Sequence, residues 1–191
     1  MFHWIIVAGF ACAWGVLVIV WIVGAFSTKS TARSASRASR LVLFGPLLGV
    51  WLLVRMQVIP PEWLVMRALP DNPAIELLGL ALTILGCLFA VWARVTLGSN
   101  WSGLPTVRRE HELITRGPYA LARHPIYTGI LLALAGSAIA NGESGWLLSW
   151  FLVLVSYKVK IRQEEQLMME TFPQDYPDYR RRVKALIPGV F

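Results

Sequence analysis

The sequence predicts an all-α integral membrane protein with about five transmembrane helices and a cytoplasmic C-terminal region. Of its 191 residues, 56% are hydrophobic and only 15% are charged, whereas soluble domains average about 45–50% apolar and about 25% charged residues. The apolar residues form long runs with few or no charges, and basic residues gather in the segments between these runs. A single water-soluble globule and a disordered chain are both excluded, because so many apolar residues require surroundings other than water.

Residues 4–26 are the first predicted span. This run holds 23 residues without a charge, which at about 1.5 Å per residue is enough to cross a hydrocarbon core about 30 Å thick. The run is too long for a signal-peptide core, and basic residues follow it instead of preceding it, so we expect a span that is not cleaved. A second span is predicted at residues 41–59, with Arg55 and Gln57 near its far end.

Three more spans complete the predicted layout. The third covers residues 74–97, the fourth covers residues 125–140 and is short for a span, and the fifth covers residues 146–159. Only the turn-forming residues 141–145 (NGESG) join the last two. We therefore expect these two helices to pair as an antiparallel hairpin, and whether the fourth crosses the bilayer fully stays open.

The basic residues orient this layout. If the N-terminus lies outside, 16 of the 18 Lys and Arg residues fall on the cytoplasmic side, the exceptions being Arg55 and Arg67. Because cytoplasmic loops carry an excess of Lys and Arg, we expect an odd number of spans and a cytoplasmic C-terminus. Topology then explains the formal charge of +7, and we expect no nucleic-acid partner.

Several common functional motifs do not occur in the sequence. It holds no Gly-x-Gly-x-x-Gly motif after a strand, no P-loop, no Gly-x-Ser-x-Gly elbow and no His-Glu-x-x-His motif. Cys12 and Cys87 lie in apolar runs without metal-ligand spacing, so we expect them to be small buried hydrophobic residues. No Rossmann domain, metal site or disulfide is therefore expected.

The first candidate site lies in residues 114–129, ITRGPYALARHPIYTG. Pro125 suits the first position of a helix, and it holds His124 in an extended conformation at the helix entrance. Backbone N–H groups and the helix dipole at such an entrance favour a carboxylate or another anion. The segment adds a positive charge and two phenols, Arg123, Tyr119 and Tyr127. The alternative is a helix cap with interfacial aromatic residues.

The second candidate site lies in residues 158–172, KVKIRQEEQLMMETF. If the fifth helix continues past the membrane, Arg162 and Glu165 are neighbours at i, i+3. Lys160 and Glu164 are then neighbours at i, i+4. Paired carboxylates at the bilayer surface suit an amine or hydroxyl groups of a ligand. The alternative is an ordinary solvated helix with ion pairs.

Two weaker features flank these candidates. Residues 97–102, LGSNWS, lie at the inner end of the third span, where Trp101 suits an interfacial anchor and Asn100 could contact a polar substrate head. Further along the chain, three aromatic residues at spacings of four and three are expected to pack on one side of a short helix: Phe172, Tyr176 and Tyr179.

Together these blocks resemble the isoprenylcysteine carboxyl methyltransferase family and its prokaryotic relatives. The similarity covers residues 94–191, half of the chain, and rests on RHPIY followed by RQEEQL and FPQDYPDY. The combination is more specific than any single block, whereas the first two spans match only in being hydrophobic. The resemblance implies an integral membrane enzyme that uses S-adenosylmethionine without a Rossmann domain. One departure is Pro173, where many members have glycine.

The resemblance also implies site residues. The expected cofactor-binding residues are Leu113, Gly117, Tyr119, Arg123, His124, Tyr127 and Glu164. The expected catalytic residues are Arg162, to orient an acceptor carboxylate, and Glu165. For an amine or thiol acceptor, the candidate base is Glu165 or His124. Asn100 and Trp101 are the expected substrate-binding residues.

The expected function is S-adenosylmethionine-dependent methyl transfer to a lipidic or prenylated acceptor, with membrane lipids as further partners. Methyl transfer from a sulfonium is an in-line displacement, so positioning and charge placement supply most of the catalysis. A phospholipid N-methyltransferase, an NADPH-dependent sterol-type reductase and a non-enzymatic membrane protein remain alternatives. We expect two regions: residues 1–93 with the first three spans and the basic inner loop, and residues 94–191 with the methyltransferase-like part.

Overall fold

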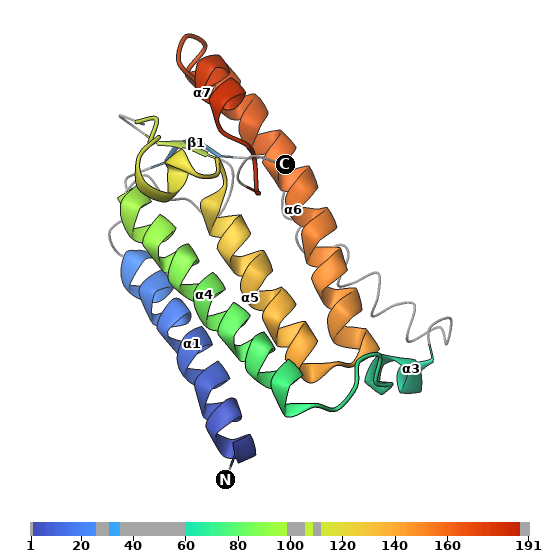
Figure 1. The fold of residues 1–191 in the computed structure, drawn as a ribbon. Coiled ribbons are helices and arrows are strands. Elements are labelled where there is room, and N and C mark those ends of the chain that lie inside the picture. The colour runs from blue at the N-terminus through green and yellow to red at the C-terminus, as the bar shows by residue number, and fades with distance from the viewer. Residues whose placement is uncertain (1, 26–30, 35–59, 99–105, 109–111, 188–191) are drawn as a thin grey trace.

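Four long helices form one layer in the order α1, α4, α5, α6 (Figure 1). The computed structural model describes residues 2–25, 31–34, 60–98, 106–108 and 112–187. The long helices are α1 (Phe2–Ala25), α4 (Pro73–Leu97), α5 (Pro125–Asn141) and α6 (Ser144–Thr171). The short elements are β1 (Thr31–Ser34), α3 (Pro61–Val65), β2 (Thr106–Arg108), the 3-10 helix η2 (Gly117–Ala120) and α7 (Tyr176–Arg182).

The predicted spans that fall on described residues are helices. α1 and α4 are each long and apolar enough to cross a membrane, judged by length and composition, and α5 is a shorter apolar helix of 17 residues. α6 contains the fifth predicted span and continues to Thr171, just before Pro173. The second predicted span, residues 41–59, lies outside the described residues.

α1 and α4 run in the same direction. Near the end of α4, Nη2 of Arg94 donates a hydrogen bond to the carbonyl oxygen of Gly24 near the end of α1, at 2.7 Å. α5 runs back and α6 runs forward again (Figure 1). α3 and the beginning of α4 therefore lie at the end of the layer where α1 begins (Figure 1).

The fold is all-helical as predicted, apart from one small two-stranded sheet. β1 and β2 pair in antiparallel fashion, with Thr31 opposite Arg108 and Ser34 opposite Thr106. The two strands follow the ends of α1 and α4. Backbone N–H and C=O groups of these neighbouring segments therefore form hydrogen bonds with each other. Strands of four and three residues are too short to show an alternating pattern. Their pairing places the two segments that were predicted as inner loops at the same end of the layer.

Glycines allow α4 and α5 to pack with their backbones in contact. Gly86 on α4 faces Gly129 on α5, and a Cβ atom added to Gly129 would lie 2.6 Å from the carbonyl oxygen of Gly86 and 2.6 Å from the backbone nitrogen of Ala90. Gly79 and Gly136 meet in the same way one heptad away. Such small-residue contacts are typical of helices that associate within membranes.

A polar cluster ties α1 to this pair of helices. Nε1 of Trp14 donates to Oγ of Ser137 at 3.2 Å, and Oγ of Ser137 lies 3.2 Å from Oγ1 of Thr83. Thr83 in turn reaches the carbonyl oxygen of Ala133 at 3.0 Å. The polar groups of this cluster are thus hydrogen-bonded inside the layer, as an apolar environment requires.

The outward faces of the long helices are apolar. Exposed large hydrophobic side chains include Trp4 and Val23 on α1, Leu88 on α4 and Phe151 on α6. This is the surface that an integral membrane protein presents to lipid. Cys87 is buried as predicted, but Cys12 is exposed on α1, because that face of α1 has no neighbouring helix among the described residues.

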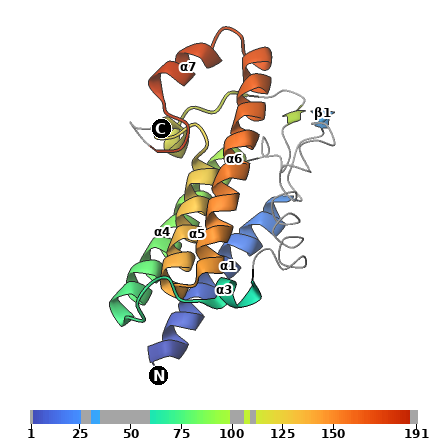
Figure 2. The same ribbon diagram turned by 90° about the vertical axis from the view of Figure 1, so that its right-hand side faces the viewer.

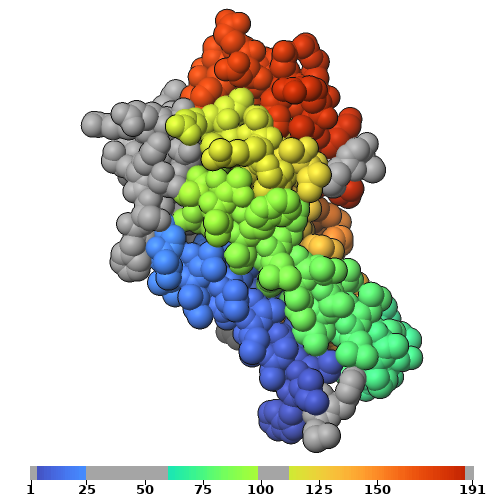
Figure 3. All heavy atoms as spheres, turned by 60° about the vertical axis from the view of Figure 1, so that its left-hand side comes forward, coloured from blue at the N-terminus to red at the C-terminus, as the bar shows by residue number. Residues whose placement is uncertain are grey.

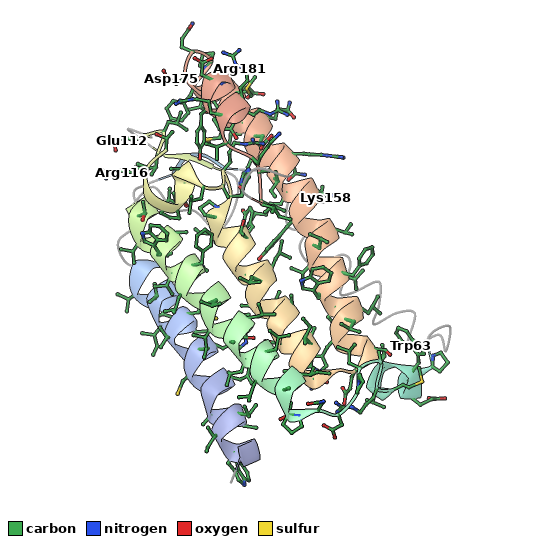
Figure 4. All side chains as sticks on the ribbon, in the orientation of Figure 1. Trp63, Glu112, Arg116, Lys158, Asp175 and Arg181 are labelled. Carbon is green, nitrogen blue, oxygen red and sulfur yellow. The ribbon has the colours of Figure 1, made fainter. Side chains whose placement is uncertain are left out.

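Charged residues gather at one end of the layer. Figure 4 shows Glu112, Arg116, Asp175 and Arg181 at the end that carries α7, and Trp63 at the opposite end beside α3. Figure 2 shows that α7 projects to one side of α6 at this end, with β1 on the other side. Sites for polar chemistry are therefore concentrated at the α7 end.

Candidate functional site

Three segments that are distant in sequence meet at the α7 end: the junction of η2 and α5, the outer part of α6, and the tail that follows α7. In Figure 3, the segment before α5 lies between the end of α4 and the α7 region. The backbone N–H of Arg123 donates to the carbonyl oxygen of Lys184 at 2.8 Å, and that of His124 donates to Ala185 at 3.0 Å. The tail thus occupies two N–H groups at the helix entrance, which the sequence suggested for an anion.

His124 lies between the two adjacent glutamates of α6. It is the N-cap residue of α5, with φ −121° and ψ 60°. Its Nδ1 lies 3.5 Å from Oε2 of Glu164, and its Nε2 lies 3.5 Å from Oε1 of Glu165. Only 9% of the side chain is exposed. Burial by itself would lower the pKa of His124, but the two carboxylates outweigh burial and raise this pKa above its ordinary value.

Glu165 is held by two arginines. Its Oε1 accepts a hydrogen bond from Nε of Arg123 at 2.8 Å, and its Oε2 lies 3.2 Å from Nε of Arg180 on α7. Burial would raise the pKa of Glu165, but contacts with His124 and Arg123 outweigh burial and lower this pKa to about 2. Arg123 also donates to the carbonyl oxygens of Arg180 and Val183, so its guanidinium fastens α7 and the tail to α6.

Glu164 points to a different group of partners. Its Oε1 accepts a hydrogen bond from the hydroxyl of Tyr127 at 2.5 Å and lies 4.0 Å from Nζ of Lys160. The ring of Tyr127 lies 5.7 Å from the ring of His124 and 4.5 Å from that of Tyr157, measured between centroids. Burial would raise the pKa of Glu164, but His124 and Lys160 outweigh burial and lower this pKa.

Aromatic residues fasten the tail over η2. The hydroxyl of Tyr179 donates to the carbonyl oxygen of Tyr119 at 2.6 Å. The rings of Tyr176 and Tyr179 meet edge-on at 5.9 Å, and both side chains are buried. The predicted packing role of these two tyrosines is confirmed. Gly117 begins η2 with φ +60°, a conformation that favours glycine.

A pocket of about 430 Å³ opens between α6 and the tail. Its lining residues are Arg123, Lys158, Ile161, Arg162, Glu165, Arg180, Lys184 and Ala185. Arg162 is exposed at this pocket. The predicted neighbours Arg162 and Glu165 therefore share the pocket, although Glu165 forms its described ion pairs with Arg123, Arg180 and His124.

The structure brings most of the predicted site residues to the same end. These are Leu113, Gly117, Tyr119, Arg123, His124, Tyr127, Arg162, Glu164 and Glu165. Asn100 and Trp101 lie outside the described residues. Sequence reasoning missed Tyr157 and Arg180. Tyr157 lies seven residues before Glu164 and so on the same helix face, whereas no local pattern indicates that Arg180 reaches Glu165.

Several known proteins are similar in sequence to this chain. The family model for phospholipid methyltransferase matches residues 75–175, just over half of the chain. Protein-S-isoprenylcysteine O-methyltransferase B of Arabidopsis thaliana is 30% identical over 115 residues, which cover 59% of this chain and 58% of that protein. The protein-S-isoprenylcysteine O-methyltransferase of Tribolium castaneum is 33% identical over 120 residues, covering 59% of this chain and 41% of that protein. This chain thus spans about half the length of these curated relatives.

Two further similarities widen the comparison. The cobalt-zinc-cadmium resistance protein CzcN of Cupriavidus metallidurans is 30% identical over 163 residues, covering 84% of this chain and 72% of that protein. The solved structure of a eukaryotic intramembrane Ras methyltransferase, an isoprenylcysteine carboxyl methyltransferase, matches with a TM-score of 0.52 at 24% identity and covers 83% of this chain and 55% of that one. The latter similarity supports the fold. The resemblance that the sequence motifs predicted is confirmed.

Proposed function

Because this chain belongs to the phospholipid methyltransferase family and is similar to protein-S-isoprenylcysteine O-methyltransferases, we propose that it is an S-adenosylmethionine-dependent methyltransferase. The acceptor in this proposal is a lipidic or prenylated carboxylate. The reaction takes place at the α7 end of the layer, which lies on the cytoplasmic side of the membrane.

The residues at this end fit the methyl donor. The donor carries an amine, a carboxylate and a sulfonium, and it supplies an electrophilic methyl group when bound. Glu164 offers a partly exposed carboxylate for a cationic group, with 20% of its side chain exposed. Nε2 of His124 is buried and has no hydrogen bond among the described residues, so it is a polar group that a ligand can satisfy. The neighbouring pocket of about 430 Å³, which His124 and Glu164 do not line, is within the usual range for small-molecule sites and holds the acceptor in this proposal.

The protein's contribution is to hold charges in place. His124, Tyr127 and Glu164 form a preorganised polar group beside the entrance of α5, and Tyr119 and Gly117 shape the adjoining turn. Glu165 and Arg123 keep α7 and the tail closed against α6, which limits access of water. Arg162 supplies a positive charge in the pocket to orient the acceptor carboxylate. Such preorganisation lowers the barrier of an in-line displacement without a proton transfer.

A carboxylate acceptor suits this site, because ion pairs with Arg123, Arg180 and His124 already engage the Glu165 carboxylate. A general base works best when its pKa lies near the working pH, whereas the pKa of Glu165 is about 2. An amine or thiol acceptor must lose a proton, but a carboxylate is already a nucleophile at neutral pH. The arrangement therefore favours O-methylation. A phospholipid N-methyltransferase is the second candidate, because the matching family model is described as phospholipid methyltransferase.

Methyl-transfer assays test the proposal. The purified full chain is incubated with labelled methyl donor and with a farnesylcysteine analogue, phosphatidylethanolamine or a small thiol. We expect label in a base-labile ester of the farnesylcysteine analogue. Label in phosphatidylethanolamine alone would favour the second candidate, and no binding of the donor by calorimetry would refute both.

A variant pair locates the site. Glu164→Gln should abolish donor binding or turnover, because it removes the charge that suits the donor's amine. Glu170→Gln is the matched control, since Glu170 is exposed on the same helix. Equal donor affinity and equal turnover in the wild type and Glu164→Gln would exclude this position from the site.

A further inference from the structure

The pocket beside α6 carries more positive charge than methyl transfer uses. Five of its lining residues are basic, and Glu165 is the one acidic residue among them. Glu165 already forms ion pairs with Arg123 and Arg180, and Arg162 orients the acceptor carboxylate in the function proposed above. Lys158 and Lys184 also line the pocket, both with exposed side chains, and no step of the methyl transfer employs them.

Lys158 lies on the membrane side of the pocket. It precedes Glu165 by seven residues, or about 10 Å along a helix axis. Residues 146–159 form the predicted fifth span, so Lys158 is at its inner end. Figure 4 shows Lys158 near the middle of α6, well away from Arg181 and Asp175 at the tip. In the predicted layout, Lys158 therefore places this edge of the pocket at the level of the lipid head groups.

The same face of α6 continues through the predicted fifth span as an apolar stripe. Phe151 and Val155 precede Lys158 at steps of three and four residues, and so lie on one helix face with it. Their side chains are 54% and 41% exposed. One helix face thus presents exposed apolar groups below a cationic pocket, which is the order of chains and head group in a phospholipid.

We propose that Lys158 and Lys184 bind the phosphate of an anionic membrane phospholipid at the mouth of this pocket. Lysine binds phosphate as a point charge, and basic pockets between membrane helices on the cytoplasmic side recognise anionic head groups. The excess of basic over acidic lining residues disfavours a head group with an added cation. The apolar stripe below the pocket favours a lipid over a soluble phosphate. The proposal does not depend on the methyl donor.

Native mass spectrometry of the purified full chain in neutral detergent tests the proposal. The probes are phosphatidylglycerol and phosphatidylcholine with identical acyl chains. We expect the wild type to retain phosphatidylglycerol at least about tenfold more tightly, which corresponds to about 1.4 kcal/mol. The double variant Lys158→Gln/Lys184→Gln should lose this preference. The control Arg116→Gln/Arg182→Gln removes two exposed charges outside the pocket and should keep it.

The following results would overturn the proposal. They are equal retention of both lipids by the wild type, an unchanged preference in the Gln double variant, and inorganic phosphate binding as tightly as phosphatidylglycerol. The charge-conserving variant Lys158→Arg/Lys184→Arg should retain the preference, and loss there would also contradict it. Thermal unfolding of each variant distinguishes a loss of lipid binding from a loss of folding.

Discussion

At the scale of single residues, the site is a set of buried charges that neutralise one another. His124 lies between two carboxylates, and Arg123 and Arg180 face one of them. Buried charges are tolerated only when they are paired and hydrogen-bonded. The adjacent glutamates therefore have different contacts: Glu164 accepts a hydrogen bond from Tyr127, whereas Glu165 joins α6 to Arg123 and to α7.

Glu165→Gln should destabilise the protein more than any exposed charge change. The side chain is 10% exposed, and removing one partner of a buried ion pair costs about 3–5 kcal/mol. The measurement is the free energy of unfolding in detergent, compared with Glu170→Gln. A change below about 1 kcal/mol in Glu165→Gln would show that the ion pairs with Arg123 and Arg180 contribute little.

The pH dependence of stability should reveal His124. Its raised pKa means that its charged form stabilises the fold fully below the ordinary value of 6.5 and that this stability is lost as the pH rises through the raised value. Glu165, with a pKa lowered from 4.5 to about 2, stabilises the fold above pH 4.5 and loses this effect as the pH falls toward 2.

The wild type should therefore exceed His124→Gln in Tm most clearly between about pH 4.5 and 6.5, and by less at alkaline pH. Thermal unfolding of both proteins across this range is the measurement. A Tm difference that grows from pH 6.5 to alkaline pH would contradict the assigned charge of His124.

At the scale of elements, the sequence predicts long helices better than their junctions. Long apolar runs predict α1, α4 and the hairpin of α5 and α6, since length and turn residues suffice. The candidate site residues on α5 and α6 were also predictable, because each group lies within one short sequence motif, RHPIY or RQEEQL. The contact of Arg180 with Glu165 and the position of the tail depend on chain folding over many residues, and no local spacing encodes them.

The contact between α4 and α5 should be sensitive to a single methyl group. Gly129→Ala places a Cβ atom against the backbone of α4, and overpacking of this kind costs about 1–3 kcal/mol. Gly15→Ala on α1 is the matched control, because a Cβ atom there meets nothing within 4 Å and alanine favours the helix. We expect a lower Tm for Gly129→Ala alone, and equal Tm values would contradict the close approach of the two backbones.

The tail should loosen when its tyrosine anchor is removed. Tyr179→Phe leaves the buried carbonyl of Tyr119 without this hydrogen bond, at a cost of about 1–3 kcal/mol. We expect faster hydrogen exchange at Val183 and in the adjoining tail, with little change in α4. Arg181→Gln on the exposed side of α7 should leave the exchange rates unchanged. Unaltered rates in Tyr179→Phe would show that other contacts suffice to close the tail.

At the scale of the whole molecule, the two ends of the layer have different characters. The α7 end gathers charged residues and the paired strands β1 and β2, and the other end holds short connections around α3. Because Lys and Arg are enriched in cytoplasmic loops, we propose that the α7 end faces the cytoplasm. Sequence charge is enough to predict sidedness, whereas the depth of α5 in the bilayer depends on its packing.

Cysteine labelling tests this orientation. In a Cys12→Ser/Cys87→Ser background, single cysteines replace Arg116 at the α7 end and Asp71 near α3, both exposed positions. A maleimide that cannot cross membranes should label Asp71→Cys in intact cells, and Arg116→Cys only in inverted vesicles. This outcome follows because 16 of 18 basic residues lie on the α7 side of the predicted layout and resist translocation. Labelling of both positions from one side would contradict a crossing between the two ends, and the reverse pattern would place the α7 end outside, where an intracellular methyl donor does not reach it.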